Sequence, residues 1–169
     1  MRRAAIVSPL RTPVGTFGGS LRAVPVEELA ATVVRAVVQR SGIDPTRIDD
    51  VVFSQGYGNG EAPAIGRWSA LAAGLPVSVP GYQLDRRCGS GLQAVIDAAM
   101  MVSTGAADVV IAGGCESMSQ VEHYTIQGRT GVKATRVSVV TDGSAATVAM
   151  TSSGAPSTSL TLASGASVA

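Results

Sequence analysis

With 169 residues, 46% of them hydrophobic and only 4% aromatic, the chain is long enough for one folded domain with a core of small aliphatic side chains. Its 13 basic and 12 acidic residues give a net charge of +1, without the basic surface that binding nucleic acid or an anionic membrane requires. Two cysteines, no recognisable secretory leader and no apolar run near the roughly 20 residues that span a bilayer predict a cytoplasmic protein without disulfides or membrane partners.

The first predicted elements are a strand and a helix. An apolar run over 4–8 that stops at a proline predicts a short buried strand. The helix is predicted from one face with apolar residues at helical spacing, namely Val26, Leu29, Ala30, Val33, Val34 and Val37. Pro25 and Gly42 mark its two ends. We expect its arginines, Arg35 and Arg40, to face solvent rather than to form a binding patch.

A second strand is predicted over 48–54, after a single turn that starts at Asp44. The glycine-rich loop that follows, 56–60, lacks the spacing of a dinucleotide-binding loop. We therefore interpret it as a tight connection to a helix at 66–73. A connector with several prolines leads from this helix to the next strand.

The segment 81–104 places Cys88 between a short strand, 82–85, and a helix. The helix is apolar on nearly every side except for a polar strip of Gln93 and Asp97, which predicts burial almost all round. A cysteine at the start of a helix lies beside free backbone N–H groups and the positive end of the helix dipole, which favour thiolate over thiol. Small residues follow it and leave room for a second molecule, so Cys88 is a candidate nucleophile. The competing interpretation, a cysteine that packs as a small hydrophobe, stays open.

A last strand over 109–112 completes the alternation of strands and helices. This order predicts an α/β domain with a largely parallel sheet covered by helices. Loops at the carboxyl ends of such strands carry the chemistry, and Cys88 lies on one of them.

Three motifs resemble the thiolase family. DRRCGSGLQAV, around Cys88, resembles the segment that carries the family's nucleophile. RTPVGTFGGSL, 11–21, resembles its N-terminal signature, and AGGCESMS, 112–119, resembles the segment that closes the first half of its core. Their order and spacing also fit, so the resemblance implies a layered α/β unit, the N-terminal half of a thiolase, over roughly 1–125. Asp85 stands where the family often has asparagine, a departure that affects only local hydrogen bonding.

The resemblance implies acyl transfer between coenzyme A thioesters, with Cys88 as the nucleophile that forms an acyl thioester and its backbone N–H in the oxyanion hole. It implies acetyl-CoA or another acyl-CoA as substrate, no bound cofactor or metal, and a homo-oligomer for the full-length family. An acetyl-CoA C-acetyltransferase is favoured over a degradative 3-ketoacyl-CoA thiolase. The residues that bind coenzyme A stay unknown. The family's catalytic histidine and second cysteine belong to a C-terminal half that is not recognisable, and neither His123 nor Cys115 matches them.

The composition changes after Thr125. Serine, threonine, alanine and glycine make up 28 of the 44 residues in 126–169, and Asp142 is the one acid there. So little apolar bulk does not offset the entropy of ordering, which predicts an irregular low-complexity tail. A shifted reading frame or a truncated gene would explain it, and a divergent linker is the alternative. The predicted domains are therefore an incomplete α/β domain, 1–125, and a tail, 126–169.

Two other functions stay open. One is a catalytically inactive thiolase fragment that only associates with a partner through exposed apolar faces. The other is a cysteine-based redox or hydrolytic domain. It is disfavoured because Cys88 has neither a C-x-x-C pattern nor a convincing histidine partner in the sequence.

Overall fold

The computed structural model describes residues 2–122, 136–141, 145–151 and 158–163. The chain divides into two compact units, Met1–Glu122 and His123–Ala169. Each is described by itself below. None of the helices in the described ranges is both long and apolar enough to cross a lipid bilayer.

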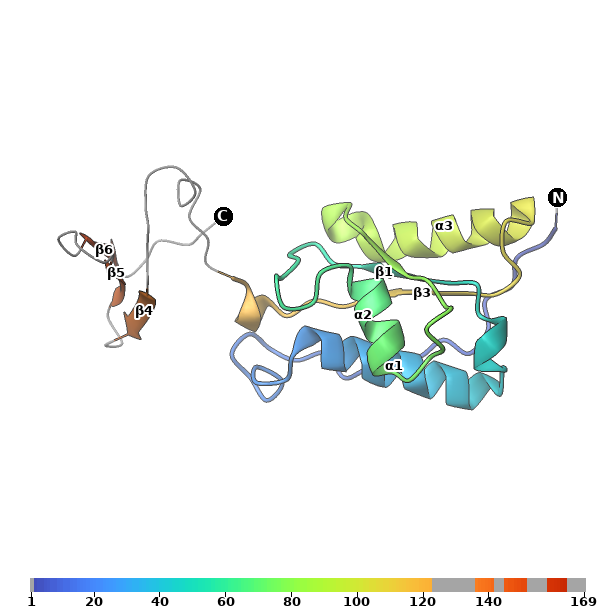
Figure 1. Ribbon diagram of the computed structural model, residues 1–169, viewed down its shortest axis with the longest axis horizontal. Helices are drawn as coiled ribbons and strands as arrows, with labels where there is room; N and C mark the ends of the chain where they lie inside the picture. Colours follow the sequence, from blue (N-terminus) through green and yellow to red (C-terminus); the bar gives the residue numbers. More distant parts are fainter. Residues whose placement is uncertain (1, 123–135, 142–144, 152–157, 164–169) are drawn as a thin grey trace. The chain divides into compact units, whose positions relative to one another are not determined.

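The first unit alternates helices and strands (Figure 1). Its elements are α1 (Val26–Ser41), η1 (Pro45–Arg47), β1 (Asp50–Ser54), α2 (Ile65–Ala72), β2 (Tyr82–Leu84), η2 (Arg87–Gly89), α3 (Ser90–Thr104), β3 (Val110–Gly114) and η3 (Met118–Gln120). The strand order is β2-β1-β3, and β1 pairs in parallel with both neighbours. Figure 1 shows α3 on one side of these strands and α1 and α2 on the other. The parallel α/β arrangement is the one that the alternation of elements predicts.

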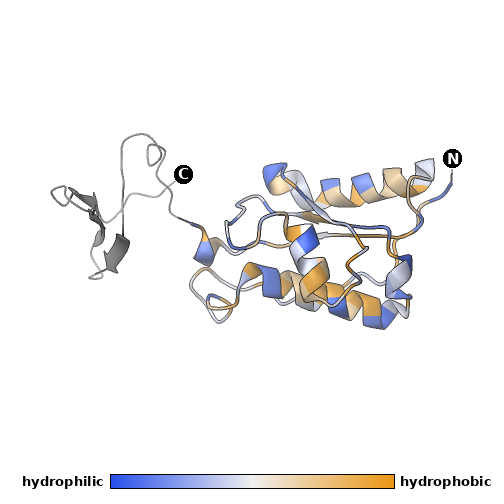
Figure 2. Ribbon diagram, viewed as in Figure 1, coloured by the Kyte–Doolittle hydropathy of each residue, from blue (hydrophilic) through white to orange (hydrophobic). Residues whose placement is uncertain are grey.

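Helix α1 has the two ends that the sequence predicts. Pro25 precedes it, and Gly42 ends it in the left-handed conformation with φ 66°. Its buried side chains are Val26, Ala30, Ala31 and Val34. Figure 2 shows apolar and polar residues alternating along α1, the pattern of a helix with one buried side. The guanidinium of Arg35 also donates an exposed 3.0 Å hydrogen bond to the Ala72 carbonyl at the end of α2.

The core is built around β1, whose central side chains Val51, Val52 and Phe53 are all buried. A strand between two parallel neighbours, with helices on both faces, is buried on both sides. The start of α2 lies directly against this sheet. A Cβ atom on Gly66 would come within 2.3 Å of the Tyr82 carbonyl oxygen, so only glycine fits this contact.

Helix α3 differs from its prediction. Its buried side consists of small residues, Ser90, Ala94 and Ala98. On the outer side Leu92 is 69% exposed and Met100 is 53% exposed, with Ile96 between them, so the prediction of burial nearly all round was wrong. The reason is that, within the first unit, the helix packs on β1 and β3 from one side only.

The predicted strand over 4–8 was also wrong. No strand is formed there, and Ile6 and Val7 are 79% and 70% exposed. The backbone N–H of Arg2 bonds the Ser103 carbonyl at 3.1 Å, but residues 3–12 then line one wall of a cavity of about 980 Å³ whose other walls include β3. An apolar run forms a strand only when a neighbouring strand pairs with it, and this run has no such neighbour in the described part of the chain.

The second unit contains an antiparallel sheet. Its strands are β4 (Arg136–Thr141), β5 (Ala145–Thr151) and β6 (Thr158–Ala163), in the order β4-β5-β6. The prediction of an irregular tail was therefore wrong for these stretches. They are rich in threonine and valine, whose branched side chains favour extended backbone, and composition alone did not reveal this. The rest of 126–169 lies outside the described residues, and so does His123.

Candidate active site

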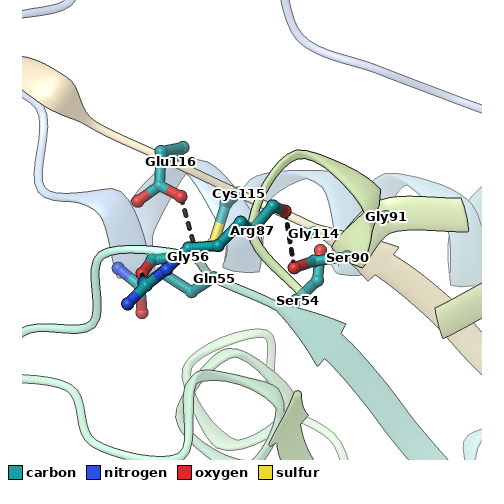
Figure 3. A pocket seen from close by; sticks show the side chains of 9 residues that line it. All are labelled: Ser54, Gln55, Gly56, Arg87, Ser90, Gly91, Gly114, Cys115 and Glu116. Carbon is teal, nitrogen blue, oxygen red and sulfur yellow. Dashed lines mark hydrogen bonds between the residues drawn. The ribbon is translucent and has the colours of Figure 1, made fainter. Parts of the chain in front are cut away.

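The loops after β1, β2 and β3 meet at the carboxyl ends of the parallel strands and enclose a pocket of about 300 Å³ (Figure 3). Its lining residues are Ser54, Gln55, Gly56, Arg87, Ser90, Gly91, Gly114, Cys115 and Glu116. Parallel strands bring their carboxyl ends to one edge, which is why residues far apart in the sequence converge here.

Cys88 lies in the middle of η2, and its side chain is exposed. It does not line the pocket itself but directly follows Arg87, which does. The turn is held by the buried Ser90, whose hydroxyl donates to the Arg87 carbonyl at 2.7 Å and accepts from the Arg86 N–H at 2.6 Å. A Cβ atom on Gly89 would meet nothing within 4 Å, so the backbone beside the thiol is open to another molecule. The structure thus places Cys88 where the sequence predicts it, at the start of α3 and after a strand.

Arg87, directly before Cys88, has a left-handed backbone with φ 50°, which residues other than glycine rarely adopt. Its N–H donates to Asp85 Oδ1 at 2.8 Å, and its guanidinium pairs with Asp85 Oδ2 at 2.9 Å. The guanidinium also donates to the Gly56 carbonyl and lies 5.5 Å from the centre of the Tyr57 ring. Asp85, the departure from the family pattern, is therefore tied to the residue before the candidate nucleophile.

Glu116 binds the loop after β1, which Arg87 also contacts through the Gly56 carbonyl. Its carboxylate accepts hydrogen bonds from the N–H of Gly56 at 2.8 Å and of Tyr57 at 3.3 Å. Figure 3 shows the Glu116 carboxylate directed at the Gly56 backbone. A Cβ atom on Gly56 would lie 3.2 Å from Glu116 Oε2, so the close approach of the carboxylate favours glycine.

Cys115 has a different environment from Cys88. It is half-buried and packs against the hydrophobic core, as the sequence predicts. Burial, with a smaller contribution from the neighbouring Glu116 carboxylate, raises the pKa of the Cys115 thiol to about 12. The thiol is therefore protonated at neutral pH and is a poor nucleophile.

Two further features complete the site. Gln55 Oε1 is buried and has no hydrogen-bond partner among the described residues, so the pocket wall offers a free acceptor. Within the same residues, no cluster of three or more His, Cys, Asp or Glu side chains could hold a metal ion.

Comparison with known proteins decides the family. A family model described as the N-terminal domain of thiolase matches residues 4–134, most of the chain. The chain belongs to the thiolase family. The resemblance seen in the three sequence motifs is thereby confirmed, and the match extends past them into the region of changed composition.

Three similar proteins from bacteria illustrate the match. This thiolase is 42% identical over 135 residues to the acetyl-CoA acetyltransferase of Cupriavidus necator, covering 79% of this chain and 34% of the relative. It is 37% identical over 142 residues to a probable acetyl-CoA acyltransferase of Staphylococcus aureus, covering 83% and 36%. The crystal structure of the Bacillus anthracis acetyl-CoA acetyltransferase superposes with a TM-score of 0.70 at 39% identity, covering 75% of this chain and 32% of that one. The thiolase chain described here spans about a third of the length of the curated relatives it matches.

Sequence reasoning missed several residues of this thiolase's pocket. The contacts of Gly56, Arg87 and Glu116 were not predicted, and the loop after β1 was interpreted only as a tight connection. Their common signal is position, since each lies just beyond the carboxyl end of a predicted parallel strand. The position of Cys88 before a helix could be predicted because its surroundings, a helix start with small neighbours, are local signals. Its role as nucleophile stays a prediction.

Proposed function

We propose that the chain is a thiolase-type acyltransferase that accepts an acetyl group from acetyl-CoA on Cys88. The observation that carries the proposal is the position of Cys88, exposed in a held turn between β2 and α3 and beside a pocket built from three strand ends. The name acetyl-CoA acetyltransferase, which several of the relatives carry, supports acetyl-CoA as the substrate, while others are named probable acetyl-CoA acyltransferase. Coenzyme A thioesters enter as substrates, and no cofactor is required.

In the proposed reaction the Cys88 thiolate attacks the carbonyl carbon of acetyl-CoA. Negative charge develops on the carbonyl oxygen, where the backbone N–H of Cys88 is one donor. The bond to the coenzyme A sulfur then breaks, and coenzyme A leaves as a thiolate that takes a proton from water. In the second half-reaction the enolate of another acetyl-CoA attacks the acyl-enzyme, releases Cys88 and gives a 3-oxoacyl-CoA.

The proposal makes different predictions for acylation of Cys88 and for steady turnover. The described residues include no histidine that could act as a base for Cys88. We therefore expect the chain to release one coenzyme A per molecule in a burst, with little steady turnover.

The test is the intact mass of the full chain after incubation with acetyl-CoA, beside Cys88→Ala and Cys115→Ala. One acetyl group should appear on the native chain and on Cys115→Ala, and none on Cys88→Ala. Acetylation that survives Cys88→Ala would assign the adduct to another residue and overturn the mechanism.

The second candidate function is an association-only fragment, favoured by the exposed apolar side chains on α3. It predicts no adduct on the native chain and iodoacetamide labelling of Cys88 no faster than that of free cysteine. The same samples therefore separate the two functions.

A further inference from the structure

The residue before Cys88 has an unfavourable backbone. At φ 50° Arg87 adopts the left-handed conformation, in which the Cβ atom of an ordinary residue is crowded. Such conformations persist only where surrounding contacts over-determine them, and they gather at functional sites. The turn of Cys88 therefore depends on what holds Arg87.

Arg87 is held by both its backbone and its side chain. Asp85 accepts the Arg87 N–H at 2.8 Å with one carboxylate oxygen and pairs with the guanidinium at 2.9 Å with the other. The guanidinium further donates to the Gly56 carbonyl and lies over the ring of Tyr57. Both polar contacts of the guanidinium use Nη1, and the Arg87 side chain is otherwise 67% exposed. One end of the cation is therefore engaged before substrate arrives.

Arg87 and Glu116, which carry opposite charges, both form hydrogen bonds with the loop after β1. Arg87 bonds the carbonyl of Gly56, while the Glu116 carboxylate accepts from the N–H groups of Gly56 and Tyr57. The loop after β1 is thus fixed between the loop before α3 and the loop after β3. The adjacent cation, Arg86, takes no part in this arrangement and donates instead to Gln93 on α3.

We propose that Arg87 is a positioning residue that holds the left-handed turn and so sets the orientation of the Cys88 thiol and backbone N–H towards the substrate carbonyl. The proposal rests on the proposed acyl transfer at Cys88. Because the Arg87 guanidinium already bonds Asp85 and Gly56, we assign its contribution to the turn and not to binding the anionic part of coenzyme A. Its contribution lies in the rate of acylation and not in the affinity for acetyl-CoA.

The experiment compares Arg87→Ala with Arg87→Gly, because glycine adopts positive φ without strain and alanine does not. Arg86→Ala is the matched control, an arginine one residue away without these contacts. Three probes are used on each full chain: acetyl-CoA, p-nitrophenyl acetate and iodoacetamide. The first two need an oxyanion donor next to Cys88, whereas alkylation by iodoacetamide needs only the thiolate.

We expect Arg87→Ala to slow acetylation by both acyl donors about ten- to a hundredfold, as a misplaced reacting group does. Its half-saturating acetyl-CoA concentration and its iodoacetamide rate should change less than about threefold, a split that general unfolding does not produce. Arg87→Gly should recover most of the lost rate, and Arg86→Ala should match the native chain. If Arg87→Ala does not fold, Asp85→Asn takes its place and should also slow acylation more than alkylation.

Unchanged acylation in Arg87→Ala, or in Asp85→Asn where that variant replaces it, would overturn the positioning role. So would a glycine variant as slow as alanine, or a raised half-saturating concentration with an unchanged maximum rate. If p-nitrophenyl acetate acylates the native chain but acetyl-CoA does not, the proposed function is overturned. The positioning role of Arg87 can then still be tested with the ester. A native chain that neither donor acylates overturns both.

Discussion

The two cysteines have different surroundings. Cys88 is exposed at the start of a helix, while Cys115 packs against the core. Only the thiolate reacts readily with alkylating reagents, and the pKa of Cys115, raised to about 12 by burial, leaves almost none of it at neutral pH. Cys115, directly after Gly114, is therefore a poor nucleophile at neutral pH, although both cysteines lie at the same edge of the sheet.

This contrast predicts selective labelling. At neutral pH iodoacetamide should modify Cys88 in the native chain and leave Cys115 unmodified until denaturant is added, as peptide mass mapping would show. Above pH 12 the two should react alike, since Cys115 then loses its proton. Equal labelling of both cysteines at neutral pH in the folded chain would contradict the burial of Cys115.

At the scale of elements, the starts of β1 and β3 are joined by one carboxylate. Asp49 accepts hydrogen bonds from the N–H groups of Val109 and Asp108 at 2.9 and 2.7 Å. These bonds, that of Val109 first, lower the pKa of Asp49 below its ordinary value of 3.8. A carboxyl with a lowered pKa in the folded state adds stability above its unfolded pKa and loses it as the pH falls through the folded value.

We therefore expect Asp49→Asn to lower the free energy of unfolding at neutral pH by about 0.5–1 kcal/mol, a small effect because the group is largely exposed and solvent screens it. The difference from the native chain should disappear at a pH well below 3.8, where the native carboxyl is protonated as well. Urea unfolding at the two pH values measures it. A deficit that persists in acid would show that the effect does not come from the charge.

The elements also show how far sequence reasoning reaches. The bounds of α1 and the start of α3 were predicted because apolar spacing and terminal residues such as Gly42 are local signals. The strand predicted over 4–8 was not formed, because a strand needs a neighbouring strand to pair with and the local sequence does not show whether one is present. In the site, Cys88 was predicted from its neighbours, whereas Glu116 reaches Gly56 only through the register that pairs Ser54 with Gly114. The predicted division into domains at residue 125 stays a prediction.

At the scale of the molecule, the first unit leaves an apolar stripe on α3. Leu92, Ile96 and Met100 follow each other at intervals of one helical turn, and all three are exposed. Apolar side chains gathered in this way gain by leaving water, whereas a single exposed one does not need a partner. The stripe therefore favours association of the chain with itself.

We expect the native chain to self-associate and the pair of substitutions Leu92→Gln and Met100→Gln to weaken this at least about tenfold, which corresponds to about 1.4 kcal/mol. Val77→Gln is the matched control, because Val77 is exposed and lies outside the stripe. Sedimentation over a range of concentrations measures the association. A native chain that stays monomeric throughout, or a control that weakens association equally, would exclude the stripe as its cause.

The central strand, β1, is also the first strand of the sheet along the chain, and this sets an order of assembly. Val52 pairs with Tyr82, whereas Asp50 pairs with Val110, a loop about twice as long that costs about 0.6 kcal/mol more to close. Loop closure therefore favours pairing of β1 with β2 over pairing of β1 with β3, and only docking of β3 brings Glu116 to Gly56. We expect the hydrogen bonds of Glu116 to the loop after β1 to form after the β1–β2 pair.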